Sequence, residues 1–157
     1  MTGAGASRGG GRAVPEWRLL GLGLALELQW EIAQYPLYDV WHRYDWDYIL
    51  YGLVHCTLGD LLILLAAYML VAGLTRDRFW YRKRPVAGGL AFTLLGVAYT
   101  AYSEINNVWI KGSWGYTDLM PLVPRIGVGG MPLLQWLLIP PVLVWLMRQF
   151  DDCHRLA

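Results

Sequence analysis

The chain has 157 residues, of which 56% are hydrophobic and only 16% are charged, whereas a soluble domain usually has about a quarter of its residues charged. Its formal net charge of +1 lacks the basic excess of a nucleic-acid-binding protein, so no nucleic-acid partner is expected. The two distant cysteines, Cys56 and Cys153, support neither a disulfide framework nor a redox motif, and no nucleotide-binding loop or zinc-protease motif occurs.

Four apolar segments predict an all-α protein, an integral membrane four-helix bundle. The segments cover residues 19–40, 48–74, 86–110 and 131–147. A helix needs about 20 residues to cross the hydrocarbon layer, and the fourth segment lies at the short limit of this range. We therefore expect a transmembrane domain at 16–150, between tails at 1–15 and 151–157.

The charges around these segments predict an orientation. The Gly-rich stretch 1–15 carries arginines and predicts a disordered tail, with a secretory signal peptide as the alternative. The second connection, "TRDRFWYRKRP", is strongly basic, whereas the connections 41–47 and 111–130 are not. By the positive-inside rule both termini are cytoplasmic, and a bacterial inner membrane is the expected location.

Polar residues recur at helical spacing inside the predicted spans. Glu27, Glu31, Gln34 and Tyr38 are spaced by 4, 3 and 4 residues, which places them on one stripe of the first helix. A second stripe on the third helix consists of Thr93, Gly96, Thr100, Glu104 and Asn107. The second helix adds His55 and Asp60, and the fourth adds Gln135.

The predicted depths of these residues in the membrane indicate that the stripes meet. Glu31, His55 and Glu104 all lie roughly 9–14 Å below the predicted outer surface, so we expect them in one cavity as catalytic candidates. Residues expected to bind a ligand around them are Glu27, Gln34, Asp60, Asn107, Trp30, Trp136 and Gln135. The two tryptophans lie within the spans, where they suit the wall of an apolar or cationic ligand site.

The spans contain acids but no Lys or Arg, and His55 is the only candidate partner of opposite sign. Each ionised acid near the bilayer centre costs about 2.5–3.5 kcal/mol on insertion scales. We therefore expect at least one of Glu27, Glu31 and Glu104 to be neutral near about pH 7, unless the acids hold a cation.

The connection 111–130 is long for a helical bundle, where about 2–8 residues are usual. Its prolines, glycines and apolar residues predict a structured lid or a re-entrant segment over the outer mouth. The aromatic residues around the two outer connections, among them Trp114 and Tyr116, predict an interfacial aromatic belt.

These features favour binding of a small apolar molecule resembling a lipid or isoprenoid, or isomerase-like acid–base chemistry on it. One alternative is metal binding by Glu31, His55 and Glu104, or proton-coupled transport of a cation. Another alternative is a non-catalytic subunit of a membrane complex. Membrane lipid is the expected partner, and assembly into a homo-oligomer is a further alternative. The sequence identifies no cofactor.

Overall fold

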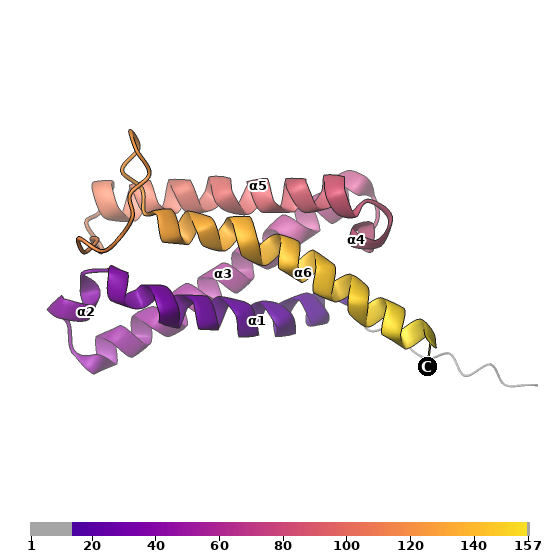
Figure 1. Cartoon of the computed structure of the whole chain (residues 1–157), viewed down its shortest axis with the longest axis horizontal. Helices are drawn as coiled ribbons and strands as arrows, with labels where there is room; N and C mark the ends of the chain where they lie inside the picture. The colour runs from indigo at the N-terminus through magenta and orange to yellow at the C-terminus, as the bar shows by residue number, and fades with distance from the viewer. Residues whose placement is uncertain (1–13, 157) are drawn as a thin grey trace, which may run out of the picture.

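The computed structural model describes residues 14–156, which form helices and connecting loops. The long helices are α1 (Pro15–Gln34), α3 (Trp46–Thr75), α5 (Pro85–Glu104) and α6 (Gly130–Leu156) (Figure 1). The short elements are η1 (Tyr35–Leu37), α2 (Val40–Arg43), α4 (Trp80–Lys83) and the π-helical turn η2 (Ile105–Ile110). No β-strand forms among the residues described, which confirms the all-α class for them. The predicted tail at 1–15 falls almost entirely outside these residues.

Three helices are long and apolar enough to cross a membrane: Trp46–Thr75, Pro85–Ile110 and Gly130–Cys153. Only 33%, 28% and 44% of their most apolar windows, respectively, are buried inside the protein, so most of their apolar surface faces outward. Three of the four predicted spans are therefore confirmed as span-capable helices. α1 is not among them, and its 20 residues include Glu16, Arg18, Glu27 and Glu31.

The long helices form a closed set of contacts, because α1 packs on α3 and α6, while α5 packs on α6 and α3. Leu19, Leu64 and Leu143 are completely buried in the shared core. A glycine brings α5 close to α6, since a Cβ atom at Gly96 would overlap the ring of Trp136. The absence of a side chain at Gly96 thus makes room for an indole in the centre of the fold.

The predicted segment 19–40 is not one continuous helix, which corrects its outer boundary. α1 ends at Gln34, two residues before Pro36, and the chain becomes extended at Tyr38. The physical reason is that Pro36 has no backbone N–H to donate to the carbonyl four residues earlier, so the α-helix gives way to the short 3-10 turn η1. At the other end of the chain α6 continues through Pro140 and Pro141, and past the predicted limit at 147, to Leu156.

The connection after η2 is fixed to the segment that follows α1. The Asp39 amide donates to the Gly115 carbonyl (3.0 Å), and the Gly115 amide donates to the Asp39 carboxylate (2.8 Å). The Thr117 amide donates to the Leu37 carbonyl (2.9 Å), and Val128 within the connection is completely buried. These contacts agree with the prediction of a structured segment. Figure 1 shows this connection at the same end as α2, opposite α4.

An ionic cluster joins the helices at the α4 end. Asp151 of α6 is buried and accepts hydrogen bonds from Arg18 of α1 (2.6 Å), from Tyr81 of α4 (2.8 Å) and from Arg82. Burial, together with the hydrogen bond to Asp151, raises the pKa of Tyr81 to about 12, so its hydroxyl remains a donor at neutral pH. One carboxylate thus connects α1, α4 and α6.

Replacement of Asp151 by Ala leaves Arg18 and Arg82 without their shared anion in a partly buried setting. We expect Asp151→Ala to destabilise the protein by about 3 kcal/mol, the lower end for breaking a buried ion pair. Thermal unfolding of the detergent-solubilised protein measures this. Asp152→Ala is the matched control, because Asp152 is the neighbouring acid and is exposed. Equal melting temperatures for the two variants would contradict a stabilising role for the cluster.

Candidate functional site

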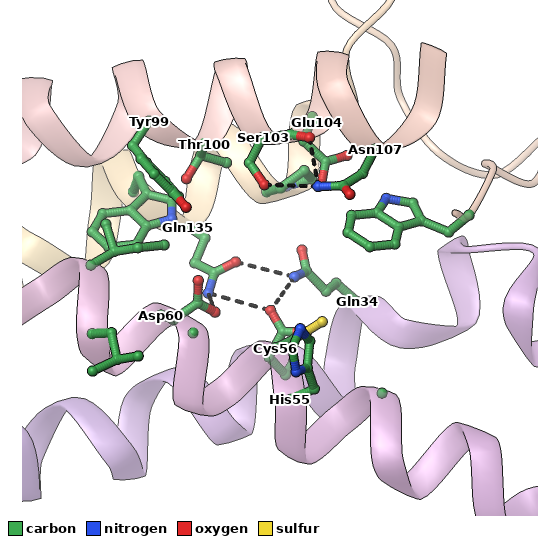
Figure 2. A pocket seen from close by; sticks show the side chains of 18 of the residues that line it. Gln34, His55, Cys56, Asp60, Tyr99, Thr100, Ser103, Glu104, Asn107 and Gln135 are labelled. Carbon is green, nitrogen blue, oxygen red and sulfur yellow. Dashed lines mark hydrogen bonds between the residues drawn. The ribbon is translucent and has the colours of Figure 1, made fainter. Parts of the chain in front are cut away.

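A cavity of about 710 Å³ lies among the four long helices. Eight of the ten predicted site residues line it: Glu31, Gln34, His55, Asp60, Glu104, Asn107, Gln135 and Trp136. Figure 2 shows Gln34, Asp60 and Gln135 on one side of the cavity, and Ser103, Glu104 and Asn107 of α5 and η2 on the other. The polar stripes predicted from the sequence thus line the same cavity.

Two glutamine amides organise the α1 side of the cavity. Gln34 Nε2 donates to Glu31 Oε1 (2.6 Å) and to Gln135 Oε1 (3.1 Å), which uses both of its hydrogens. Gln135 Nε2 donates to Glu27 Oε2 (2.6 Å) and to Asp60 Oδ2 (3.0 Å). Glu31 Oε1 lies 3.5 Å from the same nitrogen, at the limit of a hydrogen bond. We call these five side chains the acid–amide network.

Glu27 and Trp30 do not line the cavity, in contrast to the ligand-contact role predicted for them. Trp30 Nε1 donates to Gln34 Oε1 (3.1 Å), so the indole orients the amide. Glu27 is completely buried, and its Oε1 atom has no hydrogen-bond partner among the residues described. Both residues contact the glutamine side chains of the network instead, since Gln135 Nε2 donates to Glu27 Oε2 and Trp30 donates to Gln34.

The carboxyl groups of Glu31 and Asp60 meet at one amide nitrogen, because Gln135 Nε2 lies 3.0 Å from Asp60 Oδ2 and 3.5 Å from Glu31 Oε1. Two carboxylates cannot bond to each other, because neither has a hydrogen to donate, whereas a neutral carboxyl can donate to an ionised one. The surrounding groups of the network are amides and another acid, Glu27, rather than cations. This geometry therefore fits a single proton shared between Glu31 and Asp60, as two carboxyls at one site require.

Glu104, on the α5 side, has different partners. Tyr116 donates to Glu104 Oε2 (2.5 Å), and the Tyr38 hydroxyl lies 3.4 Å from Oε1. The Gly129 amide in turn donates to the Tyr116 oxygen (2.9 Å). Burial, with Glu104 alongside, raises the pKa of Tyr116, so the phenol keeps its proton for this bond. Hydroxyl donors on both carboxylate oxygens fit the ionised form of Glu104.

His55 lines the cavity but is not a partner for the acids. Its side chain is exposed and its ring stacks on Tyr51, with the ring centroids 5.6 Å apart. No ion pair joins it to a carboxylate of the described residues. Asn107 bends back to its own helix, where its Nδ2 atom donates to the Ser103 carbonyl (2.9 Å). The predicted charge balance through His55 is therefore not what the structure shows.

Sequence reasoning assigned Tyr116 and Trp114 to an interfacial belt, yet both reach the site. Tyr116 bonds to Glu104, and Trp114 lines the cavity. Both lie in the loop after η2, where no helical period indicates direction. Tyr38 was found through the α1 stripe, but it reaches Glu104 from the extended segment beyond the helix. Only the path of the connecting segments brings these rings to the carboxylate.

The metal alternative has no further support from the geometry. Within residues 14–156 no group of three or more His, Cys, Asp or Glu side chains is arranged to hold a metal ion. A scan against models of protein families, a search of curated proteins and a search of solved structures find no match to this chain. The residues of the site are therefore the basis for the function proposed below.

The shared proton makes a spectroscopic prediction. We expect the infrared spectrum of the purified protein at neutral pH to contain the C=O stretch of a protonated carboxyl group. Glu31→Gln and Asp60→Asn each remove one partner, so either variant shifts or abolishes this band. Asp47→Asn is the control, because Asp47 is exposed at the start of α3. A spectrum unchanged by both site variants would contradict proton sharing.

Proposed function

We propose that the chain is a four-span membrane protein with both termini in the cytoplasm, and that its cavity carries out acid–base chemistry on a small apolar molecule. A bacterial inner membrane is the setting that the charge pattern favours. One observation supports the proposed chemistry above all. A single, largely apolar cavity holds both the Glu31–Asp60 carboxyl pair and a separate carboxylate, Glu104, that is hydrogen-bonded to a tyrosine.

The side chains of α1 support its role as the fourth span. Its acids Glu27 and Glu31 are buried, at 0% and 5% exposure, whereas Leu24 and Ile32 are 44% and 56% exposed. A helix in water would show the opposite pattern, with apolar residues inside and acids outside. An inward-facing polar stripe and an outward apolar surface are what a membrane helix at a polar cavity requires.

The two ends of the helices support the proposed orientation. The α4 end holds Arg18, Arg78, Arg82 and Lys83, which pair with acids there. At the opposite end the described connections carry more aromatic rings than basic side chains. Because basic residues are retained on the cytoplasmic side, the α4 end faces the cytoplasm and the polar part of the cavity lies toward the outer half.

The acids have complementary roles in the proposed chemistry. The Glu31–Asp60 pair supplies a proton to one carbon of a ligand double bond, which leaves a carbocation at the other carbon. Glu104 then removes a proton from the next carbon beyond the cation, and that electron pair forms the new double bond. The double bond moves without any oxidant or reductant, and the protein ends with one proton transferred from the pair to Glu104. Proton exchange with the outer aqueous phase restores the starting state. Trp136 and the apolar wall exclude water from the carbocationic intermediate.

Material bound to the purified protein tests this function. We expect solvent extraction of the detergent-purified wild-type protein, followed by mass spectrometry, to release an unsaturated lipid-like molecule. Glu31→Gln keeps a donor and an acceptor in a similar volume, so it should preserve folding and ligand binding while abolishing turnover of that ligand. Asp47→Asn, an exposed acid, is the control that keeps both.

Other results would sustain the alternatives instead. A divalent metal found at one equivalent by elemental analysis, and lost in Glu31→Gln, would replace acid–base chemistry with the cation site. Stoichiometric co-purification of another membrane protein, with no small molecule, would favour the complex subunit. Either result would overturn the proposed function.

Accessible thiols test the topology. In a background of Cys56→Ala and Cys153→Ser, cysteines replacing Asp45 or Asp118 should react with a membrane-impermeant maleimide in intact spheroplasts. Both positions are exposed in the structure, in the connections at the end that we propose faces outward. The native Cys153, kept in a separate variant, should react only after permeabilisation. Labelling of Asp45→Cys from the inside alone would reverse the orientation.

A further inference from the structure

The cavity has two chemically different halves. Along α3 it extends from Tyr48 to Leu70, a helical rise of about 33 Å. The polar half contains the carboxyl groups and amides described above. Beyond Asp60 the lining residues are all apolar: Leu62, Ile63, Ala66, Ala67 and Leu70 of α3, facing Leu95 of α5. We call this part the apolar channel, and from Asp60 to Leu70 it is about 15 Å long.

The side of the cavity between α3 and α5 is open to the surroundings. Of the lining residues on α3, Leu62 is 68% exposed and Leu70 is 55% exposed. Tyr99, on α5, also lines the cavity and is 49% exposed. If the helices span a membrane as proposed, this opening faces the hydrocarbon of the bilayer. A ligand therefore reaches the carboxyl groups from the lipid phase without crossing water.

We propose that the occupant is a single-chain amphiphile taken laterally from the bilayer, with its head at the Glu31–Asp60 pair and its tail in the apolar channel. This inference rests on the proposed function and specifies its substrate class. A neutral head bearing a hydroxyl or carbonyl oxygen matches the network, because the shared proton can be donated to it. A lone anionic head is disfavoured by the acids Glu27, Glu31, Asp60 and Glu104.

The cavity has the size of a small-molecule site. Its volume of about 710 Å³ lies in the range of about 300–1,000 Å³ typical of such sites. Its carboxyl groups lie at one end and the apolar channel continues from them, which matches one extended molecule with a polar head and an apolar tail.

Within a membrane the tail gains nothing from leaving water, so the channel selects a ligand by fit rather than by hydrophobicity. Ala66 controls that fit, because its small, exposed side chain forms part of the channel wall. A phenylalanine there occupies the channel without disturbing the core. Ala98 of α5 is a matched control, since it is also small and exposed but does not line the cavity.

Photolabelling with hexadecanol probes tests the proposal. One probe carries a diazirine next to the hydroxyl and the other carries it at the end of the tail. We expect the first to label residues near Cys56 and Tyr99, and the second to label residues 62–70. Ala66→Phe should reduce tail-end labelling by about tenfold, the effect of roughly 1.4 kcal/mol of overpacking, whereas Ala98→Phe should not.

The two probes separate failure of this inference from failure of the proposed function. Head labelling near Cys56 with tail labelling outside 62–70, or equal effects of the two alanine variants, would overturn the apolar channel while leaving the acid–base site standing. No labelling at the site by either probe, together with ligand turnover unchanged in Glu31→Gln, would overturn both. Cross-links from Leu62 or Leu70 to a second copy that exclude the probes would assign the opening to a dimer and overturn the lateral route.

Discussion

The fold is organised around carboxyl groups that must be kept in an apolar interior. Among residues 14–156 no basic side chain pairs with the deep acids of α1 and α3, and side-chain amides donate the hydrogen bonds that these acids accept. Gln135 is the central donor, because one amide of α6 reaches Glu27 of α1 and Asp60 of α3. Gln34 then connects Glu31 to Gln135. These bonds require the three helices to approach at one depth, and the cavity forms beside them.

The opposite end of the molecule satisfies buried charge differently. Asp151 is held by two arginines and a tyrosine, so its charge is compensated by cations and it does not need to be protonated. The acids beside the cavity have no such partners among the described residues, and hydrogen bonds replace ion pairs there. This difference separates a stabilising cluster from a site whose protons can move, and it underlies the acid–base function proposed for the cavity.

Different surroundings make the two sides of the cavity chemically unequal. Glu31 and Asp60 share a site with other acids, whereas Glu104 receives hydroxyl donors from two tyrosines. One side therefore suits a proton donor and the other suits a proton acceptor, as acid–base catalysis of a double-bond shift requires. The apolar channel continues from the same space, so the proposed ligand would have its reactive end at the acids and its tail in the channel.

The sequence by itself determined the helical class, three span-capable helices and the carboxyl and amide side chains that line the cavity. This was possible because helical periodicity records which face of a helix is buried, and acids at intervals of three or four residues share that face. Periodicity gives no information about loops, so the tertiary structure alone brought Tyr116 to Glu104. It also decided that His55 stacks on Tyr51 instead of pairing with an acid. The spacing of residues along one helix determines the direction in which each side chain points from the helix axis. Which side chains of different helices meet depends on how the four long helices pack together.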